Sequence, residues 1–562
     1  MLRKVLSASF LVGLAGLATL TGVAQTPKPA QPPEAKPTPA PMGSGPKTIT
    51  EDGGQPVGDN QNSRTAGPGG PVTLDNFQLI QKLARFDRER IPQRVVHARG
   101  AGAHGEFVSY GDQSKLTKAK LFSAKDKATP VFLRFSVVIH PDGSPEQLRD
   151  PRGFSTKFYT EEGNWDLVGN NLPVFFIRDA MKFPDLIHAF KPSPVTNQQD
   201  PHRIFDFLSH VPESTHQITW LYSDRGTPAN YRQMEGFGVN ALKFVNAEGE
   251  ATYVKFNWRS MQGIKTFTDA EAKADSARNH SGFTEDLYEN IKAGKFPSWE
   301  LGIQVMKPED LDKFDFNPLD DTKVWTGIEE TKIGKMTLNK VPDNFFQFTE
   351  QVAFDPGMVV PGIELSEDKM IQGRAFSYAD TQRYRLGANY LDLPVNRPLS
   401  PVSNINQDGQ LNHRHRKGDV NYEPSIESGR RDDEKYEYSK AKLATTVVQQ
   451  PIEKQLNFKQ AGELYESFPE DQKANLVSNL AGDMKKIRDP GIKITYVSFF
   501  YRANADYGTR VAKAIGVDLE AVKQYIAKEE KAAEPNRVNT DSKIHIDGKE
   551  NKDKSGDNKD KK

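Results

Sequence analysis

Short runs of β-branched and aromatic residues, bounded by turn-forming residues, fill the chain from about residue 105 to residue 260. Residues 131–138 and 173–177 are two such runs, and each has the length of a β-strand. Residues 241–245 and 252–256 flank a short loop that contains Asn and Gly, so they predict a hairpin. Strands repeated at this spacing favour an antiparallel sheet or barrel.

The spacing of apolar residues changes in the last part of the chain. Between residues 458 and 527 they recur at helical spacing, as at Leu476, Leu480 and Met484. Strands followed by helices predict an α+β protein that ends in a helical domain. We place the folded body at about residues 71–530.

The N-terminus has the pattern of a secretory signal peptide. Arg3 and Lys4 precede a short apolar run that ends in small residues at Ala24. An uncleaved membrane anchor is the alternative, but the run is shorter than the roughly 20 strongly apolar residues that a span requires. We therefore expect residues 1–24 to be cleaved and the protein to be periplasmic or secreted, without a membrane anchor.

Two further segments lack the composition of a folded core. Residues 25–70 are rich in Pro and Gly and predict an extended linker or arm. Residues 531–562 are rich in Lys, Asp and Asn, with almost no large apolar side chains, so we expect a disordered charged tail.

Charge and cysteine content exclude several classes of function. The 75 Lys and Arg residues balance 75 Asp and Glu residues, which argues against a nucleic-acid partner. The absence of cysteine excludes disulfides, thiol nucleophiles, iron–sulfur ligation and thioether-attached haem. Any metal must bind to His, Asp, Glu, Tyr or a porphyrin.

One predicted helix carries an unusual stripe. Gly373 and Gly387 bracket thirteen residues without Gly or Pro, which predicts a helix with a glycine stop. At about 100° per residue, Arg374, Tyr378 and Arg385 fall on one face. A guanidinium one turn from a phenol favours the phenolate, which can ligate a metal. The alternative is a surface helix with a half-buried Tyr and two solvated arginines.

A second cluster lies in residues 86–102, where four arginines and His97 run into a Gly/Ala-rich stretch. Small residues there allow a bulky group to approach the backbone. His97 follows two valines, so it is either a catalytic residue in an apolar setting or a histidine of the core.

Two predicted strands add polar residues. Arg134, Ser136 and Val138 share one face of the strand 131–138 by its two-residue period. A buried Arg134 requires an anionic partner, either a ligand carboxylate or an internal Asp or Glu. Asn170 lies in a Gly-Asn-Asn sequence just before an aromatic run. These residue types also favour an ordinary turn, which is the alternative interpretation.

Taken together, these segments resemble the monofunctional haem catalases. Residues 86–102 are similar to the active-site signature of that family, and residues 374–382 to its proximal haem-ligand signature. The resemblance extends over residues 71–525 and includes near-verbatim family text at 149–154, 164–171 and 175–179.

The resemblance implies a fold. It consists of an N-terminal arm over residues 71–97, an antiparallel eight-stranded β-barrel core over 98–340, a wrapping segment with the Tyr helix over 341–455, and a C-terminal helical domain over 456–530. The chain ends soon after that helical region, as in the small-subunit type.

The resemblance also implies a haem b site. Tyr378 would be the axial iron ligand, and His97 and Asn170 the catalytic pair. The remaining site residues implied by the resemblance contact the haem or hold these side chains, and they are Arg94, Val96, Arg134, Ser136, Val138, Phe175, Phe183, Arg374 and Arg385. Among them, Ser136 would orient His97, and Arg94, Arg134 and Arg385 would bind the haem propionates. Asp150 would lie in the access channel.

The implied activity converts two hydrogen peroxide molecules to two water molecules and oxygen, which would protect the cell envelope from peroxide. The alternative is a peroxidase of the same fold acting on organic hydroperoxides, which would need a wider channel. Family members are usually homotetramers, and we expect one here. The family's NADPH site is present only in part, because His216 and Arg225 match while a Lys and two His positions do not, so NADPH binding is doubtful.

One departure from the family pattern lies near the proximal helix. The family has Ser-His-Thr where this chain has Val239-Asn240-Ala241. The implied hydrogen-bond relay then runs from Tyr378 through Arg374 to Asn240, with Asp368 beyond. Without the imidazole, we expect no relay group to titrate near pH 6–7.

Overall fold

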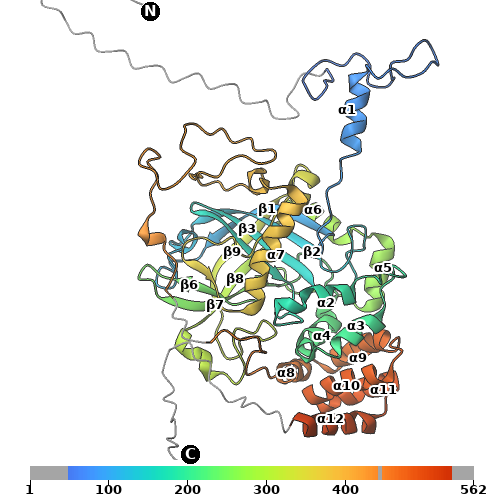
Figure 1. Cartoon of the computed structure of the whole chain (residues 1–562). Coiled ribbons are helices and arrows are strands. Elements are labelled where there is room, and N and C mark those ends of the chain that lie inside the picture. Colours follow the sequence, from blue (N-terminus) through green and yellow to red (C-terminus); the bar gives the residue numbers. More distant parts are fainter. Residues whose placement is uncertain (1–47, 441–445, 534–562) are drawn as a thin grey trace, which may run out of the picture. The chain divides into compact units, whose positions relative to one another are not determined.

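The computed structural model describes residues 48–440 and 446–533 (Figure 1). The predicted signal peptide at 1–24, much of the predicted linker and nearly all of the predicted charged tail lie outside the described residues. Within the described part, no helix is long and apolar enough to cross a membrane. The chain divides into two units, with the boundary after Arg90.

The described part of the N-terminal unit, residues 48–90, contains one helix. Helix α1 (Phe77–Phe86) begins after Asn76, whose side chain accepts a hydrogen bond from the amide of Leu79. Such an N-cap satisfies one of the free amides in the first turn. Residues 48–70 form turns and isolated bridges without a helix or a strand, as their Pro- and Gly-rich composition predicts.

The second unit is built on an antiparallel β-barrel. Eight strands close into a ring, because β7 pairs with β8 as well as with β5: β1 (Gly100–Ser109), β2 (Ala128–Val137), β3 (Arg152–Thr160), β4 (Gly163–Asn170), β5 (Gly236–Phe237), β7 (Ala251–Ser260), β8 (Ser298–Met306) and β9 (Thr331–Lys340). Strands β6 (Leu242–Val245) and β10 (Ile363–Leu365) extend the sheet from β7. The predicted α+β class with an antiparallel eight-stranded barrel is confirmed.

Aromatic side chains fill the barrel. Phe158 stacks on Trp165 with ring centroids 4.6 Å apart, and Phe107 packs edge-on against Phe158 and Trp258. All four are at most 1% exposed. Because successive strand residues face opposite sides of a sheet, alternate positions supply this core while the others remain free to build the site.

The strand predictions are right at three places and wrong at one. Strand β2 covers most of 131–138, and β6 pairs with β7 as the predicted hairpin. Residues 173–177 form no strand. Phe176 and Ile177 are buried in a cluster with apolar residues of the helices, and Phe175 packs against that cluster. A short, fully buried apolar segment has the same residue pattern as a strand, so the sequence could not distinguish a strand from a buried irregular segment.

Helices cover the barrel and follow it. The helices of the described chain after residue 90 are α2 (Phe183–Phe190), α3 (Pro201–Leu208), α4 (Thr215–Tyr222), α5 (Asp269–Arg278), α6 (Gly282–Lys292), α7 (Lys369–Leu386), α8 (Lys459–Ser467), α9 (Glu470–Met484), α10 (Pro490–Ala503), α11 (Ala505–Ile515) and α12 (Leu519–Ala533). Helices α8–α12 confirm the helical C-terminal region and pack beside α3 and α4 (Figure 1).

Helix α7 differs from its prediction at one end. It ends at Gly387, which has φ 96° as a glycine stop requires, but it begins at Lys369 after the N-cap Asp368. Gly373 is therefore a position inside the helix. A Cβ at Gly373 would lie 2.3 Å from Cβ of Ala180, so glycine here permits close packing rather than starting the helix.

Two glycines in the C-terminal helices give a matched test of this packing. A Cβ at Gly462 in α8 would lie 2.0 Å from the carbonyl oxygen of Ala503, whereas a Cβ at Gly482 in α9 meets no atom within 4 Å. We predict that Gly462→Ala lowers stability by about 1–3 kcal/mol through overpacking. Gly482→Ala should raise it by about 0.5–1 kcal/mol, because alanine favours a helix interior.

Urea denaturation of both variants, followed by far-ultraviolet circular dichroism, measures the two effects. Shifts of the same sign would contradict the close approach of α8 to α10.

Candidate active site

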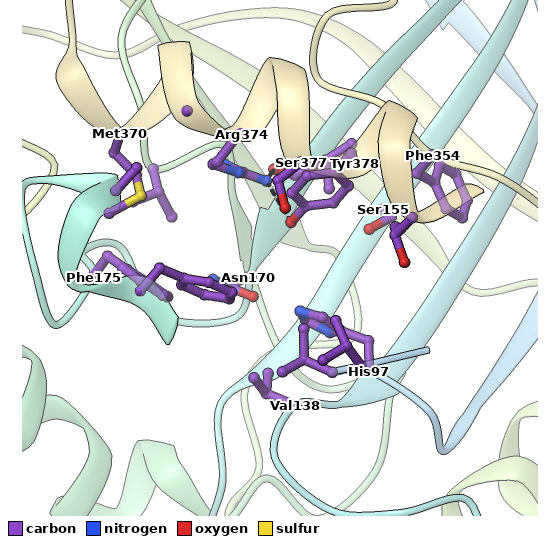
Figure 2. A pocket seen from close by; sticks show the side chains of 18 of the residues that line it. His97, Val138, Ser155, Asn170, Phe175, Phe354, Met370, Arg374, Ser377 and Tyr378 are labelled. Carbon is purple, nitrogen blue, oxygen red and sulfur yellow. Dashed lines mark hydrogen bonds between the residues drawn. The ribbon is translucent and has the colours of Figure 1, made fainter. Parts of the chain in front are cut away.

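A cavity of about 400 Å³ lies between helix α7 and the strands β2, β3 and β4. In Figure 2, Arg374 and Tyr378 point into it from α7, and His97 and Asn170 lie across it. The structure brings every predicted site residue except Arg385 to the lining of this cavity. Their catalytic and haem-binding roles stay predictions.

The α7 side of the cavity is a chain of hydrogen bonds. Nη2 of Arg374 donates to the Tyr378 hydroxyl at 3.1 Å, and Nη1 donates to Oδ1 of Asn240 at 2.6 Å. Nδ2 of Asn240 then donates to Oδ2 of Asp368 at 2.7 Å. We call these four residues the relay. A guanidinium that donates to a phenol oxygen favours the phenolate.

The far end of the relay overturns one expectation. Burial raises the pKa of the Asp368 carboxyl to about 6, even though Asn240 and the Met370 amide donate to it. The prediction that no relay group titrates near pH 6–7 is therefore wrong at the lower end of that pH range, where Asp368 titrates. It considered imidazole as the one titrating group and did not consider a desolvated carboxylate.

The opposite side of the cavity is built around His97. Its Nδ1 lies 2.8 Å from Oγ of Ser136, the contact that the resemblance implied. Burial, followed by the charges of Arg134 and Arg374, lowers the pKa of His97 to about 3. The imidazole is therefore neutral at any working pH, and Nε2 remains free to exchange a proton with a molecule in the cavity.

Backbone geometry fixes the position of His97. Its φ is 63° and that of Val239 is 66°, both in the left-handed region that β-branched and bulky residues rarely enter. Both residues line the cavity. Such strain persists where surrounding contacts hold it, and it clusters at functional sites.

A glycine makes room for the His97–Ser136 contact. A Cβ on Gly153 in β3 would lie 2.2 Å from Oγ of Ser136 and 2.6 Å from Nδ1 of His97. Asn170, at the end of β4 and opposite Gly153 in the register, also lines the cavity. The reading of Asn170 as part of a plain turn is wrong, because it belongs to a strand.

Three buried arginines lie at one end of the site. Arg134 donates to the carbonyls of His97 and Ala98 at 2.8 Å, and its Nε has no hydrogen-bond partner in the described chain. In the described chain the side chain forms no ion pair with an acidic residue, although the charge of Glu350 acts on it, so both expected kinds of anionic partner stay open. Burial lowers the pKa of Arg134 to about 10.

The other two arginines share Glu350. Arg94 lies 3.4 Å and Arg385 3.1 Å from Oε1 of Glu350, which belongs to a short π-helical turn (Phe346–Glu350). Nη1 of Arg94 has no hydrogen bond. Arg385 does not line the cavity. Its guanidinium donates hydrogen bonds to Glu350, to Gln382 and to the carbonyl of Pro92.

The structure adds residues to those predicted. Asp150 is buried and accepts a hydrogen bond from the amide of Ile139 at 2.7 Å, and its place in an access channel stays a prediction. Val239, Phe354 and Asp321 do line the cavity and were not predicted from the sequence alone. The chain separation between these residues and the signatures left no local pattern that could have found them.

Comparison with known proteins adds an independent finding. The family model described as "Catalase" matches residues 50–429, and one described as "Catalase-related immune-responsive" matches residues 451–515. A catalase of Vibrio cholerae is 56% identical over 481 residues, covering 86% of this chain and 96% of that protein. A catalase of Pseudomonas aeruginosa is 57% identical over 481 residues, covering 86% and 93%. A catalase of Listeria seeligeri is 48% identical over 479 residues, covering 84% and 98%.

The relay predicts a specific stability difference. Asn240→Leu leaves Nη1 of Arg374 and Oδ2 of Asp368 without their partner, so we expect a loss of about 2–4 kcal/mol at about 1–3 kcal/mol for each unsatisfied buried group. Asn257→Leu is the control, because Glu330 loses the amide but keeps two hydrogen bonds from Arg259. It should cost about 1 kcal/mol.

Urea denaturation of the two leucine variants measures this difference. Equal losses would mean that the relay contributes no more than an ordinary buried amide.

Proposed function

The chain belongs to the catalase family, and from that premise we propose that it converts two hydrogen peroxide molecules to two water molecules and oxygen at a haem b in the cavity described above. The observation that carries this proposal is the pairing of two supported side chains across one cavity. His97 is held by Ser136 on one side, and Tyr378 is held by Arg374 on the other.

The residues present fit a haem. Nε of Arg134 is a buried donor without a hydrogen-bond partner in the described chain, which a haem propionate would satisfy. Nη1 of Arg94 forms no hydrogen bond but lies 3.4 Å from Oε1 of Glu350, and the second propionate would give it a closer acceptor. Val96, Val138, Phe175 and Phe183 supply apolar walls for a porphyrin. Tyr378 would hold the iron, and Arg374 would keep its oxygen anionic. When bound, the haem supplies an iron that exchanges electrons with peroxide.

The chain's own residues handle protons and orientation. His97, being neutral, takes a proton from one oxygen of peroxide and returns it to the other, so that water can leave. Ser136 contacts Nδ1 of His97 and leaves Nε2 facing the cavity. The amide of Asn170 donates to the peroxide and fixes its position. Aromatic and valine side chains of the lining exclude bulk water around this exchange.

The organic-hydroperoxide alternative is not favoured. Relatives named catalases match at 48–57% identity over most of this chain, and they match with most of their own length. Hydrogen peroxide decomposition is therefore the activity that the comparisons support.

The NADPH site of the family is expected to be without function here. Arg225 pairs with Glu235 at 2.6 Å, and Arg259 pairs with both Glu235 and Glu330. His216 is buried, with Nδ1 against the carbonyl of Thr322. These internal partners neutralise the cations that a phosphate would need. We further propose a homotetramer of the small-subunit type, as the family resemblance implies.

His97 gives the direct test of this mechanism. We predict that His97→Ala lowers oxygen release from hydrogen peroxide by about 10²–10⁴-fold, the usual contribution of a general acid–base. The Soret band should persist, because His97 does not hold the haem. An oxygen electrode and an absorbance spectrum measure both properties.

His210→Ala is the matched control. Its ring contacts the Asp206 carbonyl and lies outside the cavity lining, so activity should be unchanged. A haem-loaded His97→Ala enzyme with near-normal activity would refute the assigned role.

Export provides a separate test. We propose that residues 1–24 are cleaved on export, since Arg3, Lys4, the apolar run and Ala24 form a signal-peptide pattern. Deletion of residues 1–24 should leave an active enzyme in the cytoplasm, because the cavity lining described above lies within residues 94–382. Mass spectrometry of the exported protein should find an N-terminus near Gln25. Retention of Met1 or Leu2 would contradict cleavage.

A further inference from the structure

A buried carboxyl that the mechanism above does not use also lines the cavity. Asp321 is 1% exposed, and neither Oδ1 nor Oδ2 has a hydrogen-bond partner among the described residues. Asn240, Met370 and Gly373 line the same cavity. A charged carboxylate in such a place is very costly unless it is paired, so its protonation state requires an explanation.

The adjacent carboxylate, Asp320, shows the opposite arrangement. Its Oδ1 accepts hydrogen bonds from the amide and the hydroxyl of Thr322 at 2.9 and 2.8 Å, and its Oδ2 accepts one from Nε of Arg178 at 2.9 Å. Three donors, one of them a guanidinium nitrogen, therefore surround the Asp320 carboxylate. Asp321, one residue further, has none of these donors.

Asp368 is also surrounded by donors. Its Oδ1 accepts from the amide of Met370 at 2.8 Å in the first turn of α7, and its Oδ2 accepts from Nδ2 of Asn240 at 2.7 Å. The N-terminus of a helix favours a negative charge. Both oxygens therefore act as acceptors, as in an ionised carboxylate.

Charged groups from several elements face Asp321. Burial, and then the carboxylates of Asp368 and Asp320, raise the pKa of Asp321 well above its usual range. Lys255 on β7 and Arg178 lower it by less. Lys255 donates to the carbonyl of Lys323 at 2.7 Å, and the Lys323 ammonium lies 3.9 Å from Asp320, so neither ammonium group donates to Asp321 in the described chain.

We propose that Asp321 is a positioning residue that remains a neutral acid at working pH, so that Asp368 stays ionised and fixes the Asn240 amide against Arg374. Two buried carboxyl groups that interact electrostatically do not both ionise easily, and the proton resides on the one with fewer donors. The inference rests on the proposed function in one respect: it takes Tyr378, which the relay supports, to be the iron ligand.

The negative charge of Asp368 acts on Arg374 through the orientation of the Asn240 amide. Arginine can only donate, so Asn240 must turn Oδ1 toward Arg374, and its Nδ2 then needs an acceptor. Ionised Asp368 is that acceptor. If Asp368 were protonated, its hydroxyl would donate to Oδ1 of Asn240 and favour a flipped amide, whose Nδ2 would then oppose the donors of Arg374. Arg374 would lose its support.

The direction of the pH dependence follows. A raised carboxyl pKa means that the neutral form extends to higher pH. Because burial raises the pKa of Asp368 to about 6, the relay is intact above that pH and is lost as the pH falls through it. Asp321 loses its proton only on the alkaline side.

The first experiment is infrared spectroscopy of the haem-loaded enzyme at about pH 7, where an ordinary carboxyl is ionised. Wild-type enzyme should show the band of a protonated carboxyl, and Asp321→Asn should remove it. Asp320→Asn is the matched control in the same segment and should leave the band in place. If Asp321→Asn leaves the band unchanged, Asp321 is ionised and the proposal is overturned.

The second experiment is a pH titration of the charge-transfer absorbance of the ferric enzyme. Wild type and Asp321→Asn should share an acid transition near pH 6, because a neutral amide replaces a neutral acid. An alkaline transition should be present in wild type and absent in Asp321→Asn. If Asp321→Asn lowers the acid midpoint by about one pH unit or more, Asp321 was a repelling anion and the proposal is wrong.

Two further measurements keep the inference separate from folding and from the proposed function. Asp321→Ser, a smaller neutral side chain, carries the same expectations if the amide variant does not load haem. Oxygen release by wild-type enzyme tests the function independently. Absence of oxygen release, together with the expected infrared result, would refute the function and leave the role of Asp321 supported.

Discussion

The hydrogen bonds of Arg374 are the interaction on which the site depends. One guanidinium on α7 donates to Asn240, to the carbonyl of Val168 in β4 and to the hydroxyl of Tyr378. It thus ties the helix to the barrel and supports the phenol in the same step. Because arginine donates at every working pH, this attachment requires acceptors on all sides, and the orientation of each acceptor is fixed by a further partner.

The opposite wall obeys a steric constraint. His97 has a left-handed backbone and a side chain against Ser136, and this side-chain contact requires the empty space above Gly153. The helix and the histidine therefore face one another across a gap that neither creates alone. A barrel of paired strands is stiff enough to hold such a gap open, because each strand is fixed by hydrogen bonds to two neighbours.

Charge is separated across the site. Arg94, Arg134 and Arg385 lie at one end, and burial, together with the charges of Arg134, Arg374 and Arg94, lowers the pKa of His97. Asp368 lies at the far end of the relay, where burial raises its pKa, and burial and the charges of Asp368 and Asp320 raise the pKa of Asp321. Both ends are desolvated, so small changes in protonation have large effects there. In the proposed arrangement the His97 imidazole and the Asp321 carboxyl are neutral, while Arg374 and Asp368 remain charged.

The sequence by itself determined the features that depend on local residue patterns: the fold class, individual helices and strands, and the signature segments. Strand and helix periodicity predicted the α+β class, the helical end and the hairpin of β6 and β7, and the signature segments identified His97, Asn170 and Tyr378. Only the tertiary structure decided which carboxyl faces which: Asp321 and Asp368 are 47 positions apart in the chain, and Asn240 is far from both. The same holds for residues 173–177 and for Arg385, since burial on all sides and the nearness of Glu350 depend on long-range packing. A pKa or a partner is set by neighbours in space, and periodicity along the chain carries no record of them.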